Sequence, residues 1–556
     1  MSGRTISALM AALTLVVAAP PAAMAQPAAA VASSPAQRAD ALFTAFTTDK
    51  PGLAVLVLKS GQPVYERYLG AADLEHGQAV SAASRFHVAS VSKQFTAFAI
   101  ADLAREGKVD MAADIRTYLP EMPDFGRKIT VADLLHHTSG LRDQWGLFVL
   151  SGADFQDYLK QRSILSMARS QTALNFDPGS EYEYCNTGYS LAALIVERVS
   201  GKSFRAFLAE RVFTPLGMAD TLVYDNATEL VTNRAMSYAA PSDGKVRLVR
   251  LNYNNYGATS LHTTARDLAK WGQELLHPKV LDAGVIRAMQ EPGKLRDGTP
   301  ITYGLGLISQ EVVGRKGVGH GGSDAGFRSS FMIYPGEDTS IVVLSNGQAD
   351  VGALAEKLAD VFLNEGTGAQ PTWPETPASP DKVARLAGFY VTGRHMLMEL
   401  RPDGGVLKRI GGGPPGTARF MPGGGFYMDR PVNVFTVAAN GRDLEYRSSS
   451  GGKPLVWRRI EKVTPAPAEL DAIAGVYRSD ELDITYRLAV VNGVLQLSSL
   501  RTDPAPLMPT AKDMFDAPTF YGTVVKVGRD STGKPDRLLL SLMGGRVRDV
   551  VLKRVG

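Results

Sequence analysis

A serine and a lysine that stand three residues apart, Ser90 and Lys93, are the first residues of the chain that could carry out chemistry. Residues with this spacing lie side by side on a helix, so the lysine amine can reach the serine hydroxyl. A helix N-terminus also favours negative charge, which eases formation of an alkoxide or of a neutral amine there. The pair indicates nucleophilic catalysis by Ser90, although S-x-x-K alone is equally typical of an ordinary capped amphipathic helix.

The residues around Lys93 favour the catalytic interpretation. Residues 85–97 contain no acidic side chain that would hold Lys93 in a plain surface ion pair. The competing hydroxyl, Ser92, lies about 200° round a helix from Ser90, so we expect it to face away from the hydroxyl that Lys93 contacts.

A second pair, Tyr184 and Asn186, follows a turn signal at residues 177–180 and precedes a predicted helix. A tyrosine whose pKa is lowered by a nearby ammonium can act as a base, and the amide can bind a substrate carbonyl. Taken alone, the pattern favours a core tyrosine followed by an asparagine turn. Cys185 would then point the other way as a small buried residue. No histidine adjoins it to make it a nucleophile.

The third group is His320-Gly321-Gly322-Ser323. Glycines let a strand edge approach a ligand closely and leave N–H donors free. The backbone amides of Ser90 and Ser323 could jointly form an oxyanion hole. Taken alone, the segment is equally typical of a glycine-rich loop with an incidental histidine.

Adjacent histidines, His136 and His137, could indicate a metal site. Their position where a leucine-rich helix passes into a loop favours a structural role instead, so we expect no metal and no other cofactor.

The elements that must position these groups follow from the hydrophobic pattern. Apolar runs predict early strands, helical spacing predicts a helical middle section, and further apolar runs predict late strands. We expect the early and late strands to share one antiparallel sheet with helices packed on it, an α+β fold. The predicted strands are 52–58, 64–69, 329–332 and 340–344, and the predicted helices are 90–105 and 189–199.

In the order S-x-x-K, Y-x-N, H-x-G, these groups resemble the serine β-lactamase and penicillin-binding protein superfamily. The resemblance is greatest to the branch with class C β-lactamases, D-alanyl-D-alanine carboxypeptidases, D-aminopeptidases and family VIII esterases. It covers about residues 37–365 and implies a β-lactamase/transpeptidase-like catalytic domain over 37–369. Further matching stretches are residues 131–141, 178–179, 213–218 and 263–268.

The resemblance implies a role for each catalytic candidate. Ser90 would be the acylated nucleophile, and Lys93 and Tyr184 would form the general-base pair. No glutamate motif of the class A type is evident to drive deacylation, so the same pair would have to activate the water.

Four further residues would bind substrate. Asn186 would orient the substrate amide, and the Ser323 amide would hold the oxyanion. His320 and Gly322 take the places of Lys and Gly in the family's Lys-Thr-Gly motif. A neutral histidine holds a substrate carboxylate less firmly than a lysine, so we expect poor β-lactamase activity. Peptidase, amidase and esterase chemistry remain open.

The C-terminal part of the chain is a repeat of short strand-like runs. Residues 386–390 resemble 473–477, and residues 456–460 resemble 551–555. Pro-rich stretches at 370–380 and 464–467 mark the linkers. Two small antiparallel β-barrels over 381–462 and 469–556 would remove exposed sheet edges, although one larger β-domain is the alternative.

This layout resembles D-aminopeptidases, which carry two C-terminal eight-stranded barrels after the catalytic domain. In that family a loop from the last domain reaches the active site and shapes the preference for a free amino terminus. Residues 501–521 are one candidate for such a loop in this chain.

The N-terminus has the pattern of a cleaved signal peptide over residues 1–25. Arg4 precedes an apolar stretch from Ile6 to Ala19, and Ala23-Met24-Ala25 is an A-x-A cleavage signal. The apolar run is too short to span a bilayer well. We therefore expect a periplasmic or secreted protein without stable membrane insertion, with residues 26–36 as a leader.

Composition narrows the class of partner. The 556 residues are too many for one hydrophobic core, and 45% of them are hydrophobic. A formal charge of +4, from 60 basic and 56 acidic residues, gives no reason to expect nucleic acid. A single cysteine, Cys185, excludes an internal disulfide.

The leading hypothesis is an exported serine hydrolase that acts through an acyl-enzyme as a D-stereospecific peptidase, either a D-aminopeptidase or similar to a D-Ala carboxypeptidase. A family VIII-type esterase, a weak β-lactamase and a non-catalytic penicillin-binding sensor stay open. The expected partner is a small peptide, ester or lactam, with cell-wall peptides among the candidates.

Overall fold

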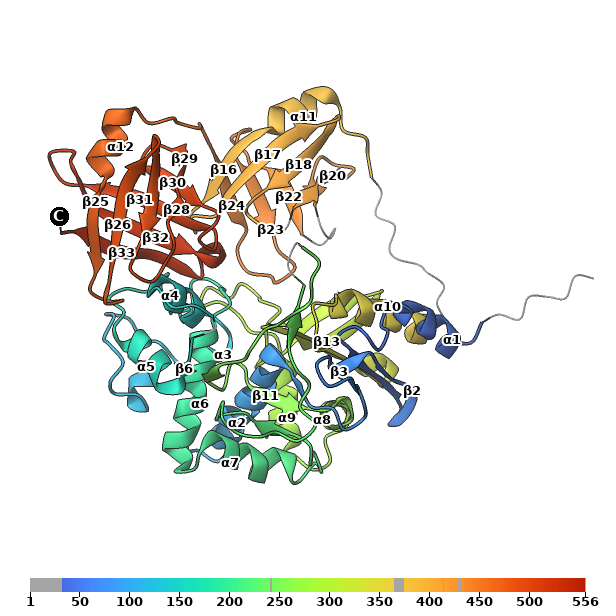
Figure 1. Ribbon diagram of the computed structural model, residues 1–556. Helices are drawn as coiled ribbons and strands as arrows, with labels where there is room; N and C mark the ends of the chain where they lie inside the picture. Colours follow the sequence, from blue (N-terminus) through green and yellow to red (C-terminus); the bar gives the residue numbers. More distant parts are fainter. Residues whose placement is uncertain are drawn as a thin grey trace, which may run out of the picture.

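The computed structural model describes residues 33–155, 157–240, 243–364, 375–413, 415–428 and 433–555. They form an α+β domain and two β-barrels, and both barrels lie on the same side of that domain (Figure 1). The predicted signal peptide, most of the predicted leader, and residues 370–374 of the Pro-rich spacer lie outside the described residues.

A six-stranded antiparallel sheet organises the first domain, in the order β12-β13-β14-β15-β1-β2. Strand β1 pairs with β15 from Leu53↔Ser345 onward, so early and late strands share one sheet as predicted. The strands are β1 Leu53–Lys59, β2 Gln62–Leu69, β12 Ile308–Val312, β13 Arg315–Asp324, β14 Phe327–Tyr334 and β15 Thr339–Ser345.

Both faces of this sheet are covered, because side chains alternate along a strand. Leu53, Val55 and Val57 of β1 enter one core, and Ala54 and Leu56 enter the other. Helices α1 (Pro35–Asp40) and α10 (Val351–Leu363) cover the first face, and α8 (Ala265–Leu276) covers the second.

Helix α2 (Lys93–Arg105) lies at the centre of the domain and is buried from Lys93 to Leu103. It packs on α6 (Asn186–Ser200), which includes the helix predicted over 189–199 and is capped by Gly201 in the left-handed conformation (φ 69°). The other helices of the domain are α3 Val131–Leu135, α4 Gln144–Leu150, α5 Gln161–Arg169, α7 Phe204–Leu208 and α9 Ala283–Gln290. Its short strands are β3 Ala71–Asp73, β4 Gln78–Ala79, β5 Phe86–His87, β6 Leu159–Lys160, β7 Leu222–Val223, β8 Tyr238–Ala239, β9 Arg247–Leu248, β10 Tyr253–Asn254 and β11 Leu261–Thr263. Among the described residues, no helix has the length and apolarity needed to cross a membrane.

The two C-terminal sheets are nearly closed barrels of nine strands each. The resemblance implies eight, and the difference is one interrupted strand. The end strands of the first sheet are separated only by Ala418, whose N–H donates to Leu407 O at 2.8 Å. Leu507 occupies the equivalent place in the second sheet and donates to Leu495 O at 2.8 Å. Near closure leaves little free strand edge in either barrel.

The element bounds of the two barrels follow the repeat. The first has α11 Pro380–Leu386, β16 Gly388–Thr392, β17 Leu397–Asp403, β18 Val406–Ile410, β19 Gly416–Thr417, β20 Arg419–Phe420, β21 Phe426–Tyr427, β22 Val434–Val437, β23 Leu444–Arg447 and β24 Leu455–Ile460. The second has α12 Pro467–Ile473, β25 Gly475–Ser479, β26 Ile484–Val491, β27 Val494–Ser498, β28 Ala505–Pro506, β29 Met508–Ala511, β30 Met514–Ala517, β31 Thr523–Arg529, β32 Pro535–Leu542 and β33 Val547–Arg554.

Equivalent hydrogen bonds confirm that the barrels are repeats rather than one larger β-domain. The Tyr390 hydroxyl donates to Leu386 O at 2.9 Å, and the Tyr477 hydroxyl donates to Ile473 O at 2.6 Å. Each bond ties the first strand of a barrel to the short helix before it, which fixes how the chain enters the barrel.

The second barrel is docked on α4 of the first domain. Leu147 and Leu150 of α4 belong to the hydrophobic core of that barrel. Beside them Arg142 and Glu481 form an ion pair at 3.0 Å, with side chains only 2% and 4% exposed. Neither charge can return to water while the domains are docked, so the loss of either partner would leave an uncompensated buried charge at this contact.

Removing one charge of the buried pair should therefore destabilise the docked state. Glu481→Gln leaves Arg142 buried without a counter-charge, and we expect a loss of about 3–5 kcal/mol in unfolding free energy. The matched control is Asp297→Asn in the exposed Lys453–Asp297 pair, where the loss should be about 0–1 kcal/mol. Urea unfolding followed by fluorescence measures both, and equal losses would contradict the buried-pair account.

Candidate active site

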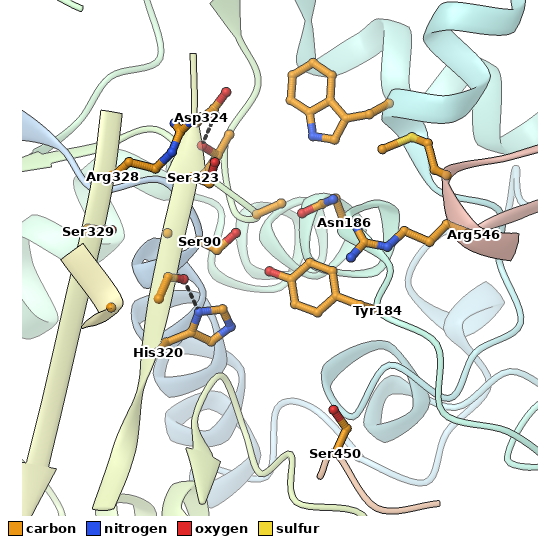
Figure 2. A pocket seen from close by; sticks show the side chains of 18 of the residues that line it. Ser90, Tyr184, Asn186, His320, Ser323, Asp324, Arg328, Ser329, Ser450 and Arg546 are labelled. Atoms are coloured by element: carbon orange, nitrogen blue, oxygen red, sulfur yellow. Dashed lines mark hydrogen bonds between the residues drawn. The ribbon is translucent and has the colours of Figure 1, made fainter. Parts of the chain in front are cut away.

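A cavity of about 1310 Å³ opens where the three domains meet. It brings together six of the seven predicted site residues (Figure 2), and the seventh, Lys93, lies beneath Ser90. The six are Ser90, Tyr184, Asn186, His320, Gly322 and Ser323. The barrels complete its walls with Arg394, Met396, Tyr446, Ser448, Ser450, Gly451, Lys453, Leu455, Met543, Gly544 and Arg546.

Ser90 lies in a turn of 3-10 helix, Ala89–Ser92, directly before α2. The α-helix therefore begins at Lys93, three residues later than predicted. Ala89 is in the left-handed region at φ 48°, a strained conformation for a residue with a Cβ. The tight turn lets the Ser90 side chain face the cavity while Lys93 reaches it from below.

The Lys93 amine is fully buried, and each of its three donors has a partner. It donates to Ser90 Oγ at 3.1 Å, to Asn186 Oδ1 at 2.8 Å and to Ala258 O at 2.7 Å. Burial lowers the pKa of Lys93 to about 7, because desolvation disfavours the charged form. A large share of the amine is therefore neutral near pH 7 and can accept the Ser90 proton.

Tyr184 stands over Lys93, whose Nζ lies 4.8 Å from the ring centroid. Its buried hydroxyl has no hydrogen-bond partner among the described residues. Ser90 lies near enough to lower the pKa of the phenol. Burial raises the pKa of Tyr184 above its usual value, and this outweighs the effects of Ser90 and Arg546. The prediction that an ammonium lowers this pKa is therefore wrong: Tyr184 is a neutral phenol near pH 7, able to relay a proton.

The orientation of Asn186 depends on Asp143, a residue that the sequence analysis missed. One Asp143 oxygen, Oδ2, accepts from the Asn186 backbone N–H at 2.6 Å and from its side-chain Nδ2 at 2.9 Å. These two hydrogen bonds orient the Asn186 side chain so that its Oδ1 faces the Lys93 amine. The other oxygen caps α4 by accepting from Trp145 N–H at 3.0 Å. A helix cap is the only role that a lone aspartate at this position indicates.

Strand β13 forms the opposite wall and must approach the Ser90 turn closely. A Cβ on Gly322 would lie 2.2 Å from Ser329 Oγ and 2.4 Å from Val88 O, so only glycine fits there. His320 faces Tyr303, with 2.9 Å between its Nε2 and the phenol oxygen. Burial and the nearby Lys93 lower the pKa of His320 to about 3. The histidine is therefore neutral, as the sequence analysis assumed.

Cys185 points away from the cavity, as predicted. Its thiol donates to Leu141 O at 3.3 Å, and burial raises the thiol pKa to about 12. The Cys185 backbone N–H donates to His137 Nδ1 at 3.0 Å, so His137 has a structural partner. In the part of the chain that the structure describes, no three His, Cys, Asp or Glu side chains are grouped as metal ligands would be.

The second barrel reaches the cavity through the turn Met543–Arg546 between β32 and β33. Arg546 O accepts from the Asp143 N–H at 3.0 Å, and the Arg546 guanidinium lies 5.0 Å from the Tyr184 ring centroid. The predicted segment 501–521 does not line the cavity. Its Tyr521 ring packs instead on Phe155, at 5.4 Å between centroids. The consecutive glycines before Arg546, between two strand-like runs, are the signal that could have located the turn.

Comparison with known proteins gives the family. Residues 39–363 match the model of the family described as Beta-lactamase. The chain belongs to the beta-lactamase family. It is a serine hydrolase, with the β-lactamase/transpeptidase-like fold that the motifs predict.

Relatives match along most of the chain. A D-aminopeptidase of Brucella anthropi is 28% identical over 440 residues, covering 78% of this chain and 80% of the relative. A D-aminopeptidase of Brucella canis is 27% identical over 508 residues, covering 87% and 92%.

Solved structures share the fold. The octameric penicillin-binding protein homologue from Pyrococcus abyssi aligns with a TM-score of 0.53 at 22% identity, covering 73% of this chain and 96% of its own. SurE aligns with a TM-score of 0.51 at 18% identity, covering 93% and 97%.

The close approach of β13 can be tested with two neighbouring glycines. Gly322→Ala should displace β13 from the Ser90 turn and lower kcat/KM by about 100-fold or more, because small misplacements of reacting groups are this damaging. Gly321→Ala is the matched control, since its added Cβ would meet only Ser329 O, at 3.7 Å. Steady-state kinetics on an ester substrate measure both variants, and comparable losses would rule out the steric explanation.

The titration of Lys93 gives a second prediction. A base role for Lys93 requires its neutral form, so it predicts that kcat/KM rises with pH through about 7. Arg546 is one of the charges that lower the pKa of Lys93. Arg546→Met should therefore move the rising limb to higher pH, whereas Lys453→Met, on the cavity wall but paired with Asp297, should not. A pH–rate profile of each variant decides, and an unmoved limb in Arg546→Met would contradict the assignment.

Proposed function

We propose that this protein is an exported D-stereospecific aminopeptidase that forms an acyl-enzyme on Ser90. The observation that carries the proposal is the buried Lys93 amine, hydrogen-bonded to Ser90 Oγ and with its pKa lowered to about 7. The two relatives named D-aminopeptidase, which match along most of their length, support the substrate class.

Acylation follows from the positions of the four side chains. Neutral Lys93 accepts the Ser90 proton as Oγ attacks the scissile carbonyl carbon. The backbone amides of Ser90 and Ser323 stabilise the negative charge that develops on the carbonyl oxygen. The Tyr184 phenol passes its proton to the leaving nitrogen and regains one from Lys93. The C–N bond then breaks and the Ser90 ester remains.

Deacylation uses the same groups in reverse. A water takes the place of the leaving amine and gives a proton to Tyr184 as its oxygen attacks the ester carbonyl, while Tyr184 passes its own proton to Lys93. The bond to Ser90 Oγ breaks, and the serine regains its proton. Asn186, held by Asp143, orients the scissile amide of the substrate during acylation.

The neutral His320 favours an aminopeptidase over a D-Ala carboxypeptidase. A carboxypeptidase must hold the free carboxylate of its substrate, and at this place a neutral imidazole supplies no charge to do so. The cavity walls from both barrels favour a small peptide over a long chain. The A-x-A signal at residues 23–25 supports export to the periplasm or beyond, and N-terminal sequencing should give Gln26 as the first mature residue.

A substrate panel tests the proposal. The p-nitroanilides of D-Ala and L-Ala, p-nitrophenyl acetate and nitrocefin distinguish D-peptidase, esterase and β-lactamase activity. We expect turnover of D-Ala p-nitroanilide, little of its L-isomer, slow turnover of the acetate and little of nitrocefin. Ser90→Ala should lower every activity by about 1000-fold or more. Full turnover by Ser90→Ala, or equal turnover of the two alanine anilides, would overturn the proposal.

A further inference from the structure

Asp324 is the last residue of β13 and lines the cavity directly after Ser323 (Figure 2). Its side chain is 17% exposed. One carboxylate oxygen, Oδ2, accepts from Thr259 Oγ1 at 2.7 Å. No lysine or arginine nitrogen of the described residues lies within 4 Å of this carboxylate, and the Arg328 guanidinium acts on it only from a greater distance.

The other carboxylates that line the cavity are occupied. Glu183 is paired with Arg394, and Arg546 lies 4.0 Å from it. Asp350 accepts from Ala353 N–H at 3.0 Å and caps α10. Of the cavity carboxylates among the described residues, Asp324 is thus the one that neither pairs with a cation within 4 Å nor caps a helix.

Three side chains lie near the Asp324 carboxylate besides Thr259. His87 Nε2 lies 3.8 Å from Oδ2, but burial lowers the pKa of His87, so the imidazole is neutral. The Tyr253 phenol also lies beside the carboxylate and carries no charge. The Arg328 guanidinium acts on Asp324 from beyond 4 Å and donates its hydrogen bonds to two backbone carbonyls, at 3.0 and 2.7 Å. A carboxylate that has only neutral groups within 4 Å is suited to an ammonium ligand.

The position of Asp324 along β13 specifies which ammonium. Side chains alternate along the strand, so His320, Gly322 and Asp324 share one face, with the Ser323 amide between the last two. A substrate whose carbonyl oxygen is held by that amide has its α-carbon one bond from the carbonyl carbon, and its α-nitrogen one bond further. The α-nitrogen therefore lies in the vicinity of the residue next to Ser323.

We propose that Asp324 binds the free α-ammonium of the substrate's first residue and thereby selects amino-terminal residues for cleavage. This inference rests on the proposed aminopeptidase function. A blocked amine has no charge for Asp324, so such a substrate would lose this interaction and leave the carboxylate desolvated and unpaired.

Asp324→Asn keeps the shape and the bond from Thr259 but removes the charge. We expect it to lower kcat/KM for D-Ala p-nitroanilide by about 10- to 100-fold, the range for a lost charged hydrogen bond. The loss for p-nitrophenyl acetate, which has no amine, should stay below about threefold. Wild type should prefer D-Ala p-nitroanilide to its N-acetyl derivative, and Asp324→Asn should lose most of that preference. Asp350→Asn, another cavity carboxylate, is the matched control and should keep the preference.

The outcomes separate this inference from the proposed function. If wild type cleaves D-Ala p-nitroanilide through Ser90 but Asp324→Asn lowers anilide and acetate turnover equally, or lowers neither, the ammonium site is wrong and the aminopeptidase stands. If wild type cleaves the free and acetylated anilides equally, or neither of them, both are wrong. The wild-type comparison of the two anilides decides even if Asp324→Asn fails to fold.

Discussion

The burial of one amine is the constraint on which the rest of the site depends. Lys93 is the first residue of a helix, its side chain is fully buried, and all three donors of its amine are taken up by Ser90, Asn186 and Ala258. A charged amine in such a place is disfavoured, so desolvation lowers the pKa of Lys93 to about 7. Three features surround this amine and position it beside the Ser90 hydroxyl. They are the Ser90 turn, the hydrogen bonds from Asn186 to Asp143, and the close approach of β13.

The barrels belong to this arrangement. The segment just before Tyr184 carries Glu181 and Glu183, and its counter-charges come from the barrels, Arg394 from the first and Arg548 from the second. Arg546 adds a cation beside the Tyr184 ring. Arginines of the docked barrels thus balance the charges of two acidic residues that lie just before Tyr184. Barrel docking therefore affects the electrostatics of the active site.

Much of this could be predicted from local patterns. The S-x-x-K spacing placed Lys93 beside Ser90, the apolar runs gave the shared sheet, and the repeated Gly-x-Tyr segments gave two barrels. What could not be predicted depends on segments far apart in the chain. In the sequence, Asp143 indicates only a helix cap, and its contact with Asn186 depends on the packing of α6 beside it. The Met543–Arg546 turn is one of several glycine-rich turns in the sequence, and only the docking of the barrel places it at the cavity. The raised pKa of Tyr184 follows from its burial in the folded protein, which the spacing of residues along the sequence does not reveal.

Trapping the covalent intermediate tests the central claim most directly. Wild-type protein mixed with a chromogenic substrate that it turns over is quenched in acid during steady state, digested and mapped by mass spectrometry. The account predicts an acyl group on the peptide that contains residues 90–93, with fragmentation placing it on Ser90. An acyl group on Ser92 or Cys185, or none on any peptide while product forms, would contradict it.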